Sequence, residues 1–345
     1  MYKYPEEYLE SASKYLKDND VDFSGAKILI TGASGFIGSW LIELLRYYSK
    51  AESQNIEVLG LSRNLKTTFE KIGQENFEFL NWVKGGVEKL PEIKFNFSHA
   101  IHCATPTTKE TGSDDSENVR QSSIGGLNYL LDSAKFNGNR PRILHTSSGA
   151  VYGKIQDVDG KYPLHQDFQE ATVDRFSKHF VYATAKRETE LKLNQATKVG
   201  DVSGVNARLF AFFGPGFPTT SHYAIGNLIN QAVYSESLYL NGTGMAMRSY
   251  LTGNAMAAVV LYVLSTELIG ATHVGSSDGE TLKNWGQMIS EISGKPLEIL
   301  SNFDDSLDRY VPNWDEKIPK IDFEQDHRRV IRRWLEYVSA NSKLD

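Results

Sequence analysis

The sequence predicts an α/β protein with a doubly wound parallel sheet, followed by a smaller α/β domain. Short apolar runs with the length of buried strands alternate with segments of helical apolar spacing over roughly the first 210 residues. A glycine-rich turn directly follows the first of these strands. After Phe212 the alternation stops, and loops with short mixed elements follow.

The elements follow from these patterns in chain order. Residues 5–17 place their apolar side chains near one helical face, which predicts an N-terminal helix. The apolar run 27–30 predicts a buried strand, and the alternation then continues. We expect further strands at 56–61, 100–104, 142–146 and 205–210, and helices at 40–48, 124–136 and 182–195.

Composition limits the class of protein. The 345 residues include 37 Lys and Arg against 43 Asp and Glu, a net charge of −6, so no basic surface for general nucleic-acid binding is expected. The single cysteine, Cys103, excludes an internal disulfide and a multi-cysteine metal site, and we expect no bound metal. Residues 1–20 contain no apolar targeting segment, and the longest apolar stretch, 255–264, is about half of a bilayer span. We therefore expect a cytoplasmic protein without a membrane anchor.

The strongest local motif is the segment 31–38, Thr-Gly-Ala-Ser-Gly-Phe-Ile-Gly, between the first strand and a helix. Gly32 permits a tight turn, Gly35 lets the backbone approach a pyrophosphate, and Gly38 permits close packing of helix on strand. The helix N-terminus then faces the anion. The motif predicts a Rossmann-type site for a dinucleotide at Gly32, Ser34, Gly35, Phe36, Ile37 and Gly38.

The end of the second strand indicates which dinucleotide is bound. NAD sites often place a carboxylate there for the ribose 2′-hydroxyl, but residues 60–64 contain none. Ser62 and Arg63 are suited to hold a 2′-phosphate, since a guanidinium matches phosphate geometry. The cofactor is therefore NAD(P), with a preference for NADP(H). The alternative is that Arg63 is a solvated loop residue.

A pair of residues suited to acid–base chemistry lies on the helix expected at 182–195. Tyr182 and Lys186 are four residues apart and share one helical face. A nearby ammonium would stabilise the phenolate and lower the tyrosine pKa. Ser147 and Ser148 follow the strand at 142–146, where a hydroxyl can bond a substrate hydroxyl or carbonyl; turn chemistry is the alternative for either serine.

Together these motifs resemble the extended short-chain dehydrogenase/reductase family, in its nucleotide-sugar epimerase/dehydratase branch. The resemblance covers roughly residues 25–300 and includes Ile101–Ala104, which is similar to a strand that lines the cofactor, and Leu240–Gly244 followed by Arg248. It implies a Rossmann-type domain at 25–211, preceded by a helical extension at 1–24. It also implies a sugar-nucleotide-binding domain at 212–345, from which segments around 252–275 return to the first domain.

The resemblance also implies roles for single residues. Tyr182 is the general base or acid at the sugar, Lys186 lowers its pKa and bonds the nicotinamide ribose, and Ser148 matches the catalytic Ser/Thr. Ala104 lines the cofactor, and Arg248 contacts the substrate diphosphate. Candidates for the pocket that selects the sugar are Phe212, Phe217, His222, Tyr223 and Asn227.

The same family indicates which reactions to expect. Its 4,6-dehydratases carry Asp-Glu after the catalytic threonine, and its decarboxylases carry a Glu in that segment, whereas this chain has Gly149 and Ala150. We therefore favour redox chemistry at one carbon, C4, as a 4-epimerase or a 4-keto-sugar reductase. The alternatives are a 4,6-dehydratase or decarboxylase with a non-standard acid/base, and a non-catalytic dinucleotide-binding protein. We expect a nucleotide-sugar substrate, a homodimer and a role in polysaccharide biosynthesis.

Overall fold

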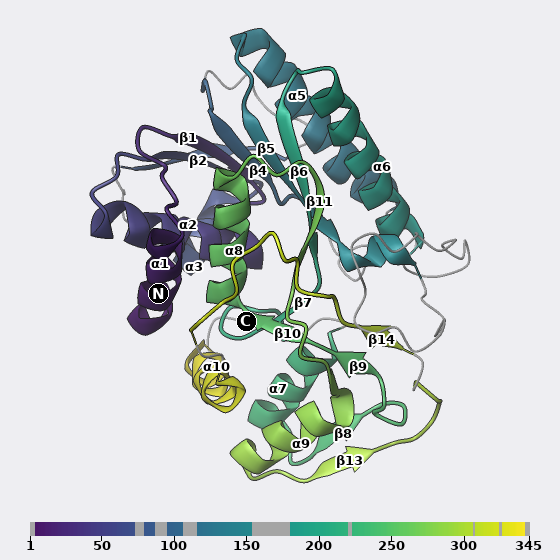
Figure 1. Cartoon of the computed structure of the whole chain (residues 1–345). Coiled ribbons are helices and arrows are strands. Elements are labelled where there is room, and N and C mark those ends of the chain that lie inside the picture. The colour runs from purple at the N-terminus through teal and green to yellow at the C-terminus, as the bar shows by residue number, and fades with distance from the viewer. Residues whose placement is uncertain are drawn as a thin grey trace.

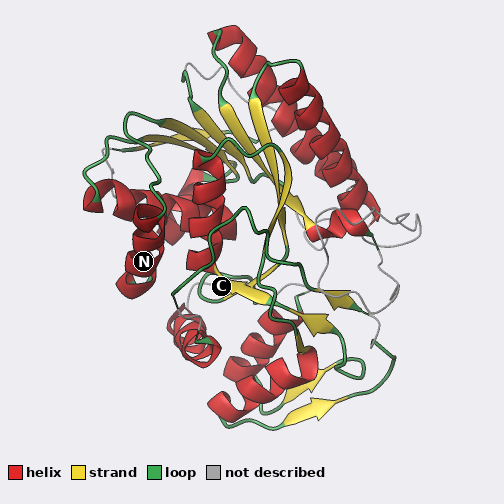
Figure 2. Cartoon of the chain, in the orientation of Figure 1, coloured by secondary structure: helices red, strands yellow, loops and turns green. Residues whose placement is uncertain are grey.

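The structure, a computed structural model, describes residues 4–72, 79–86, 95–105, 116–153, 180–219, 223–305, 308–323 and 326–341. A large sheet with helices on both faces occupies one part of the molecule, and a smaller group of helices and short strands lies below it (Figures 1 and 2). This smaller group, from β7 to α10 without α8 and β11, is called the second lobe.

The large sheet is parallel throughout and confirms the predicted fold class. In the described part of the chain its order is β11-β6-β5-β4-β1-β2-β3. The chain runs outward from β1 to β3 and then crosses to β4 on the other side of β1, which leaves a switch point between β1 and β4. The strands are β1 (Lys27–Thr31), β2 (Glu57–Ser62), β3 (Leu80–Lys84), β4 (His99–His102), β5 (Arg142–Ser148), β6 (Ser203–Leu209) and β11 (Gly270–Val274).

Helices cover both faces of this sheet, as Figure 1 shows. On one face α1 (Glu6–Asp18), α2 (Phe36–Ala51) and α8 (Gly253–Ser265) pack against one another. On the other face lie α4 (Ser116–Arg120), the π-helical turn η1 (Gln121–Gly125), α5 (Gly126–Asn137) and α6 (Phe180–Lys198). The apolar run 255–264 forms α8, which is buried on almost every side, and none of the described helices combines the length and apolarity that a membrane span requires.

The second lobe has its own apolar core, which includes Phe213, Trp285 and Trp334. Its helices are α7 (Ala224–Tyr234), α9 (Leu282–Ser293) and α10 (His327–Asn341). Its strands form three small sheets, β10-β7, β12-β9-β14 and β13-β8. They are β7 (Ala211–Phe213), β8 (Leu238–Leu240), β9 (Met247–Arg248), β10 (Tyr250–Thr252), β12 (Glu280–Thr281), β13 (Leu297–Ile299) and β14 (Arg309–Tyr310).

Several elements of the sheet region were not expected from the sequence: α4, β11, and the helix and strand that follow β2. Helix α3 (Leu65–Ile72) follows β2, and β3 forms the edge of the sheet. Along β3 only Leu80 is fully buried, because an edge strand is covered on fewer sides. It therefore lacks the continuous apolar run that marks the inner strands.

Candidate functional site

The glycine turn between β1 and α2 has the geometry of an anion site. Gly32 has a φ of +67°, and a Cβ there would lie 2.8 Å from the backbone nitrogen of Ala104. A Cβ on Gly38 would lie 2.5 Å from the Gly32 carbonyl oxygen, so both positions require glycine. Gly35 caps α2 in extended conformation, and the first amides of α2, at Phe36 and Ile37, have no helical partners. Such a helix N-terminus fits the pyrophosphate of a dinucleotide.

The end of β2 differs in part from the sequence-based expectation. Ser62 is buried, and its hydroxyl bonds Thr68 Oγ1 at 2.7 Å and Ser34 Oγ at 3.2 Å. The Ser62 hydroxyl therefore contacts the glycine turn from the buried side. This position leaves Ser62 poorly placed to hold a 2′-phosphate. Arg63 is exposed and directly follows the strand. A contact to a 2′-phosphate at this edge would therefore depend on Arg63.

The structure brings Ser148, Tyr182 and Lys186 together at the carboxyl end of β5. Ser148 is the last residue of β5, and the other two lie on successive turns of α6. Ser148 lies near the phenol of Tyr182 and lowers the pKa of that phenol by hydrogen bonding, against the effect of burial. Lys186 is 2% exposed, and its Nζ lies 5.7 Å from the centroid of the Tyr182 ring.

The pKa of Tyr182 differs from the expectation. Burial raises it, and the hydrogen bond with Ser148 opposes that effect only in part. Lys186 directs its ammonium to the Thr146 carbonyl oxygen at 2.6 Å and to Thr105 Oγ1 at 3.0 Å instead of the phenol oxygen. Burial lowers the pKa of Lys186 itself to about 7. Desolvation and the neighbouring Tyr223 and Tyr310 thus raise the pKa of Tyr182, and Ser148 is the group that lowers it. The expected effect of Lys186 on this pKa stays a prediction.

A buried ion pair beneath these residues was missed by the sequence analysis. Glu190, one turn after Lys186, accepts hydrogen bonds from Arg208 of β6 at 2.7 and 3.0 Å. Ser147 donates to the same carboxylate, and Arg208 also donates to Tyr152 Oη at 2.8 Å. Through these hydrogen bonds Glu190 holds α6 against the carboxyl ends of β5 and β6. In the sequence this pair is indicated only by the position of Glu190, which follows Lys186 at the same four-residue spacing that separates Tyr182 from Lys186.

Position 149, where the dehydratases of the family that this sequence resembles carry an acid, is enclosed. Gly149 is buried in the short helix η2 (Gly149–Tyr152). A Cβ there would lie 2.6 Å from the Phe210 ring and 2.8 Å from Tyr310 Oη. Tyr310 comes from β14 of the second lobe and was not anticipated, because no local pattern marks a two-residue strand so late in the chain.

The second lobe also holds the candidate substrate residues. Arg248 pairs in register with Tyr310 in the β9–β14 ladder, and its guanidinium bonds Asp308 Oδ2 at 2.7 Å. Asn227 lies partly exposed on α7. His222 lies outside the described residues.

The aromatic candidates join the second lobe to the glycine turn. The Phe217 ring centroid is 5.2 Å from that of Phe36 and 4.9 Å from that of Tyr223. Phe212 and Phe36 have centroids 6.4 Å apart. Phe36 of α2 therefore contacts both strand and loop residues of the second lobe.

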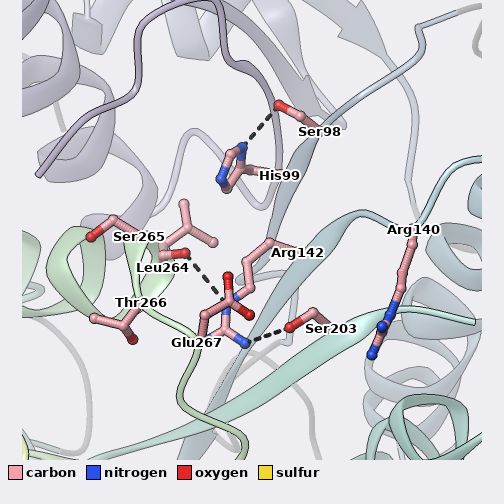
Figure 3. Close-up of a pocket in the computed structure, with 9 residues that line it drawn as sticks. All are labelled: Ser98, His99, Arg140, Arg142, Ser203, Leu264, Ser265, Thr266 and Glu267. Carbon is pink, nitrogen blue, oxygen red and sulfur yellow. Dashed lines mark hydrogen bonds between the residues drawn. The ribbon is translucent and has the colours of Figure 1, made fainter. Parts of the chain in front are cut away.

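A separate hollow of about 320 Å³ lies at the opposite, amino end of the strands (Figure 3). Arg142 dominates it, donating to Ser203 Oγ at 3.0 Å and to carbonyl oxygens of Val263, Leu264 and Leu268. The carbonyls of Val263 and Leu264 lie in the last turn of α8, so the guanidinium caps that helix. Burial lowers the pKa of Arg142 to about 10. Because four of its five donors are already used, we assign this hollow a structural role.

Comparison with known proteins identifies the relatives of the chain. The profile described as "NAD dependent epimerase/dehydratase family" matches residues 28–274. UDP-glucuronic acid decarboxylase 1 of Xenopus tropicalis is 23% identical, over 96% of this chain and 77% of that protein. Tetraketide alpha-pyrone reductase 1 of Arabidopsis thaliana is 29% identical, over 94% and 95%. UDP-glucuronic acid 4-epimerase from Bacillus cereus, solved with UDP-glucuronic acid and NAD, superposes with a TM-score of 0.76 at 18% identity, over 91% and 99%.

Proposed function

This chain belongs to the NAD dependent epimerase/dehydratase family, and from that premise we propose that it oxidises or reduces C4 of the sugar in a sugar nucleotide. The product is either the 4-epimer or the 4-hydroxy sugar formed from a 4-keto substrate. The observation that supports this best is the convergence of Ser148, Tyr182 and Lys186 at the end of β5 beside a position, Gly149, that has no room for an acid.

In this proposal the residues divide the chemistry between them. Tyr182 exchanges the proton of the C4 oxygen, and Ser148 hydrogen bonds the same oxygen or the phenol. Lys186 holds the loop after β4 and the last part of β5 together through Thr105 and Thr146. A nicotinamide dinucleotide bound at the glycine turn supplies the hydride acceptor or donor. Arg248 moves its guanidinium from Asp308 to the substrate diphosphate, with which it makes charge-assisted hydrogen bonds.

The reductase form is favoured by two observations. Arg63 is exposed where a 2′-phosphate would lie and no carboxylate accompanies it, which supports NADP(H) over NAD(H). The Arabidopsis relative with 29% identity is itself named a reductase. The Bacillus cereus neighbour, by contrast, was solved with NAD, which supports the epimerase form.

The alternatives require features that the described residues do not supply at the expected positions. A 4,6-dehydratase or decarboxylase, as the Xenopus relative is named, would need an acid/base in place of Gly149 and Ala150. A non-catalytic dinucleotide-binding protein would not need the Tyr182–Lys186 pair.

Product analysis separates these possibilities. The purified protein is incubated in deuterated water with UDP-, dTDP-, CDP- and GDP-sugars and, separately, with 4-keto sugar nucleotides. Each substrate is offered with the oxidised or the reduced form of NAD or NADP. The products are identified by NMR. Epimerisation gives two C4 epimers without net cofactor change, and reduction consumes reduced cofactor and 4-keto sugar together. Solvent deuterium at C5 would instead indicate elimination, and no product with any substrate would favour the non-catalytic alternative.

Calorimetric titration tests the cofactor assignment. We expect NADPH to bind more tightly than NADH and Arg63→Ala to remove that difference, with Lys66→Ala, on the exposed side of α3, as the control. Tighter binding of NADH by the wild type would overturn the assignment and favour the epimerase. Homodimerisation and a role in polysaccharide biosynthesis are part of the same proposal and derive from the family resemblance, and a cytoplasmic location is proposed with them.

A further inference from the structure

A tyrosine from the second lobe reaches the serine of the catalytic group. Tyr310 Oη lies 3.2 Å from Ser148 Oγ, although β14 and β5 belong to different sheets. The Tyr310 ring packs against Phe210, with centroids 4.8 Å apart. The missing side chain at Gly149 leaves the space that the phenol oxygen occupies, since a Cβ there would lie 2.8 Å from it.

The hydrogen-bonding capacity of Ser148 makes this contact informative. A serine hydroxyl donates one hydrogen bond and accepts two. The amide of Ala150 already donates to Ser148 Oγ at 3.1 Å. If Tyr310 donates as well, both acceptor positions are filled, and the serine proton is left to donate to its remaining neighbour, Tyr182.

The acceptors within reach of the Tyr310 proton indicate that Tyr310 is the donor in its hydrogen bond with Ser148. Burial raises the pKa of Tyr310 to about 12, so the phenol keeps its proton at physiological pH. Its proton has two acceptors, Ser148 Oγ at 3.2 Å and the Leu209 carbonyl oxygen at 3.4 Å. The serine oxygen is the closer of the two, and 3.4 Å is long for an O–H···O bond.

We propose that Tyr310 is a positioning residue that donates to Ser148 and thereby directs the serine proton towards the phenol oxygen of Tyr182. This inference rests on the proposed function only in taking Tyr182 as the proton-exchanging group. Because Tyr310 and Arg248 are paired in adjacent strands, the same small sheet that would contact the diphosphate also orders the hydroxyl of Ser148.

Kinetics of Tyr310→Phe test the proposal. We expect kcat to fall roughly tenfold, the typical effect of one hydrogen bond, with the substrate KM and cofactor affinity unchanged. The acidic limb of the kcat–pH profile should move to higher pH, since the phenolate of Tyr182 loses a donor. Tyr239→Phe, an exposed tyrosine on β8, is the matched control.

A double-mutant cycle shows whether Tyr310 acts through Ser148. In a Ser148→Ala background, Tyr310→Phe should have no further effect on kcat. An equal tenfold loss in that background would overturn the proposal, because Tyr310 would then act on the substrate directly.

A measurement without turnover separates this inference from the proposed function. A fluorinated tyrosine, more acidic than tyrosine, is incorporated at position 182 and titrated by ¹⁹F NMR, with and without Tyr310→Phe. We expect the titration midpoint to rise by about one pH unit in the variant, tenfold in the ionisation constant. A midpoint that falls or stays constant would show that Tyr310 donates to Leu209 and would overturn the proposal, whether or not any sugar nucleotide is turned over.

Discussion

Substituting Glu190 with glutamine should destabilise the protein far more than the same change two residues earlier on α6. Glu190 and Arg208 are 4% and 8% exposed, and the carboxylate accepts two hydrogen bonds from the guanidinium. The pKa of Arg208 is raised mainly by Glu190, against the effect of burial, so the guanidinium stays charged. Removing the carboxylate takes away the counter-ion that Glu190 provides to this buried charge.

The magnitude follows from the burial of the pair. Breaking a buried ion pair by removing one partner costs about 3–5 kcal/mol of unfolding free energy. For 345 residues this corresponds to a fall of roughly 4–7 °C in Tm. Glu188→Gln is the matched control, because Glu188 pairs with Arg120 on the surface, where side chains are 47% and 59% exposed. An exposed pair contributes at most about 1 kcal/mol.

The assay is equilibrium unfolding in urea, followed by circular dichroism, on the wild type and both variants. Equal midpoints and slopes for the two variants would refute the reasoning. So would a loss below about 1 kcal/mol for Glu190→Gln, since the pair would then behave as a solvated one.

Four further outcomes are expected. Tyr182→Phe should lower turnover by roughly 10²–10⁴-fold and leave NAD(P) affinity by calorimetry unchanged; near-normal turnover would remove it from the mechanism. Because the pKa of Lys186 is about 7 when folded against an ordinary 10.5, the unfolded chain binds more protons between these values, and wild-type stability rises with pH across that window. Lys186→Met should therefore gain stability relative to the wild type most below about pH 7, and a pH-independent difference in urea unfolding would contradict this. Gly149→Ala should cost about 1–3 kcal/mol in the same assay by overpacking against Phe210, and a neutral effect would mean that the ring moves aside freely. Arg248→Ala should raise the substrate KM by roughly 10- to 100-fold without affecting dinucleotide binding; the reverse pattern would place Arg248 at the cofactor.

The sequence predicts well those parts of the fold that are marked by apolar runs or glycine spacings within a few residues of one another. In the strand at 27–31, residues 28–30 form an apolar run that is fully buried. The spacing of the glycines in the turn that follows is explained by the close contacts of Gly32 and Gly38. The edge strand β3 was not found, because its burial is incomplete. Helix α3, which precedes β3 in the chain, was not predicted either.

The candidate site divides in a similar way. Ser148, Tyr182 and Lys186 lie at the end of one strand and on one helix, and parallel topology brings these elements to the same sheet edge. Tyr310 could not be found in this way, because only the pairing of β14 with β9 carries it to Ser148. The pKa of Tyr182 also required the structure, since it depends on how much water the packed second lobe excludes.

Gly149 illustrates how sequence and structure answer different questions about one position. The sequence indicates only that an acid is missing, which leaves open a carboxylate supplied from elsewhere. In the structure a Cβ at this position would overlap the Phe210 ring, at 2.6 Å, and approach Tyr310 Oη to 2.8 Å. A carboxylate at position 149 and the phenol of Tyr310 therefore compete for one space. Elimination that uses an acid at position 149 would require both aromatic rings to repack, whereas proton exchange at a single carbon needs only the groups that are already in place.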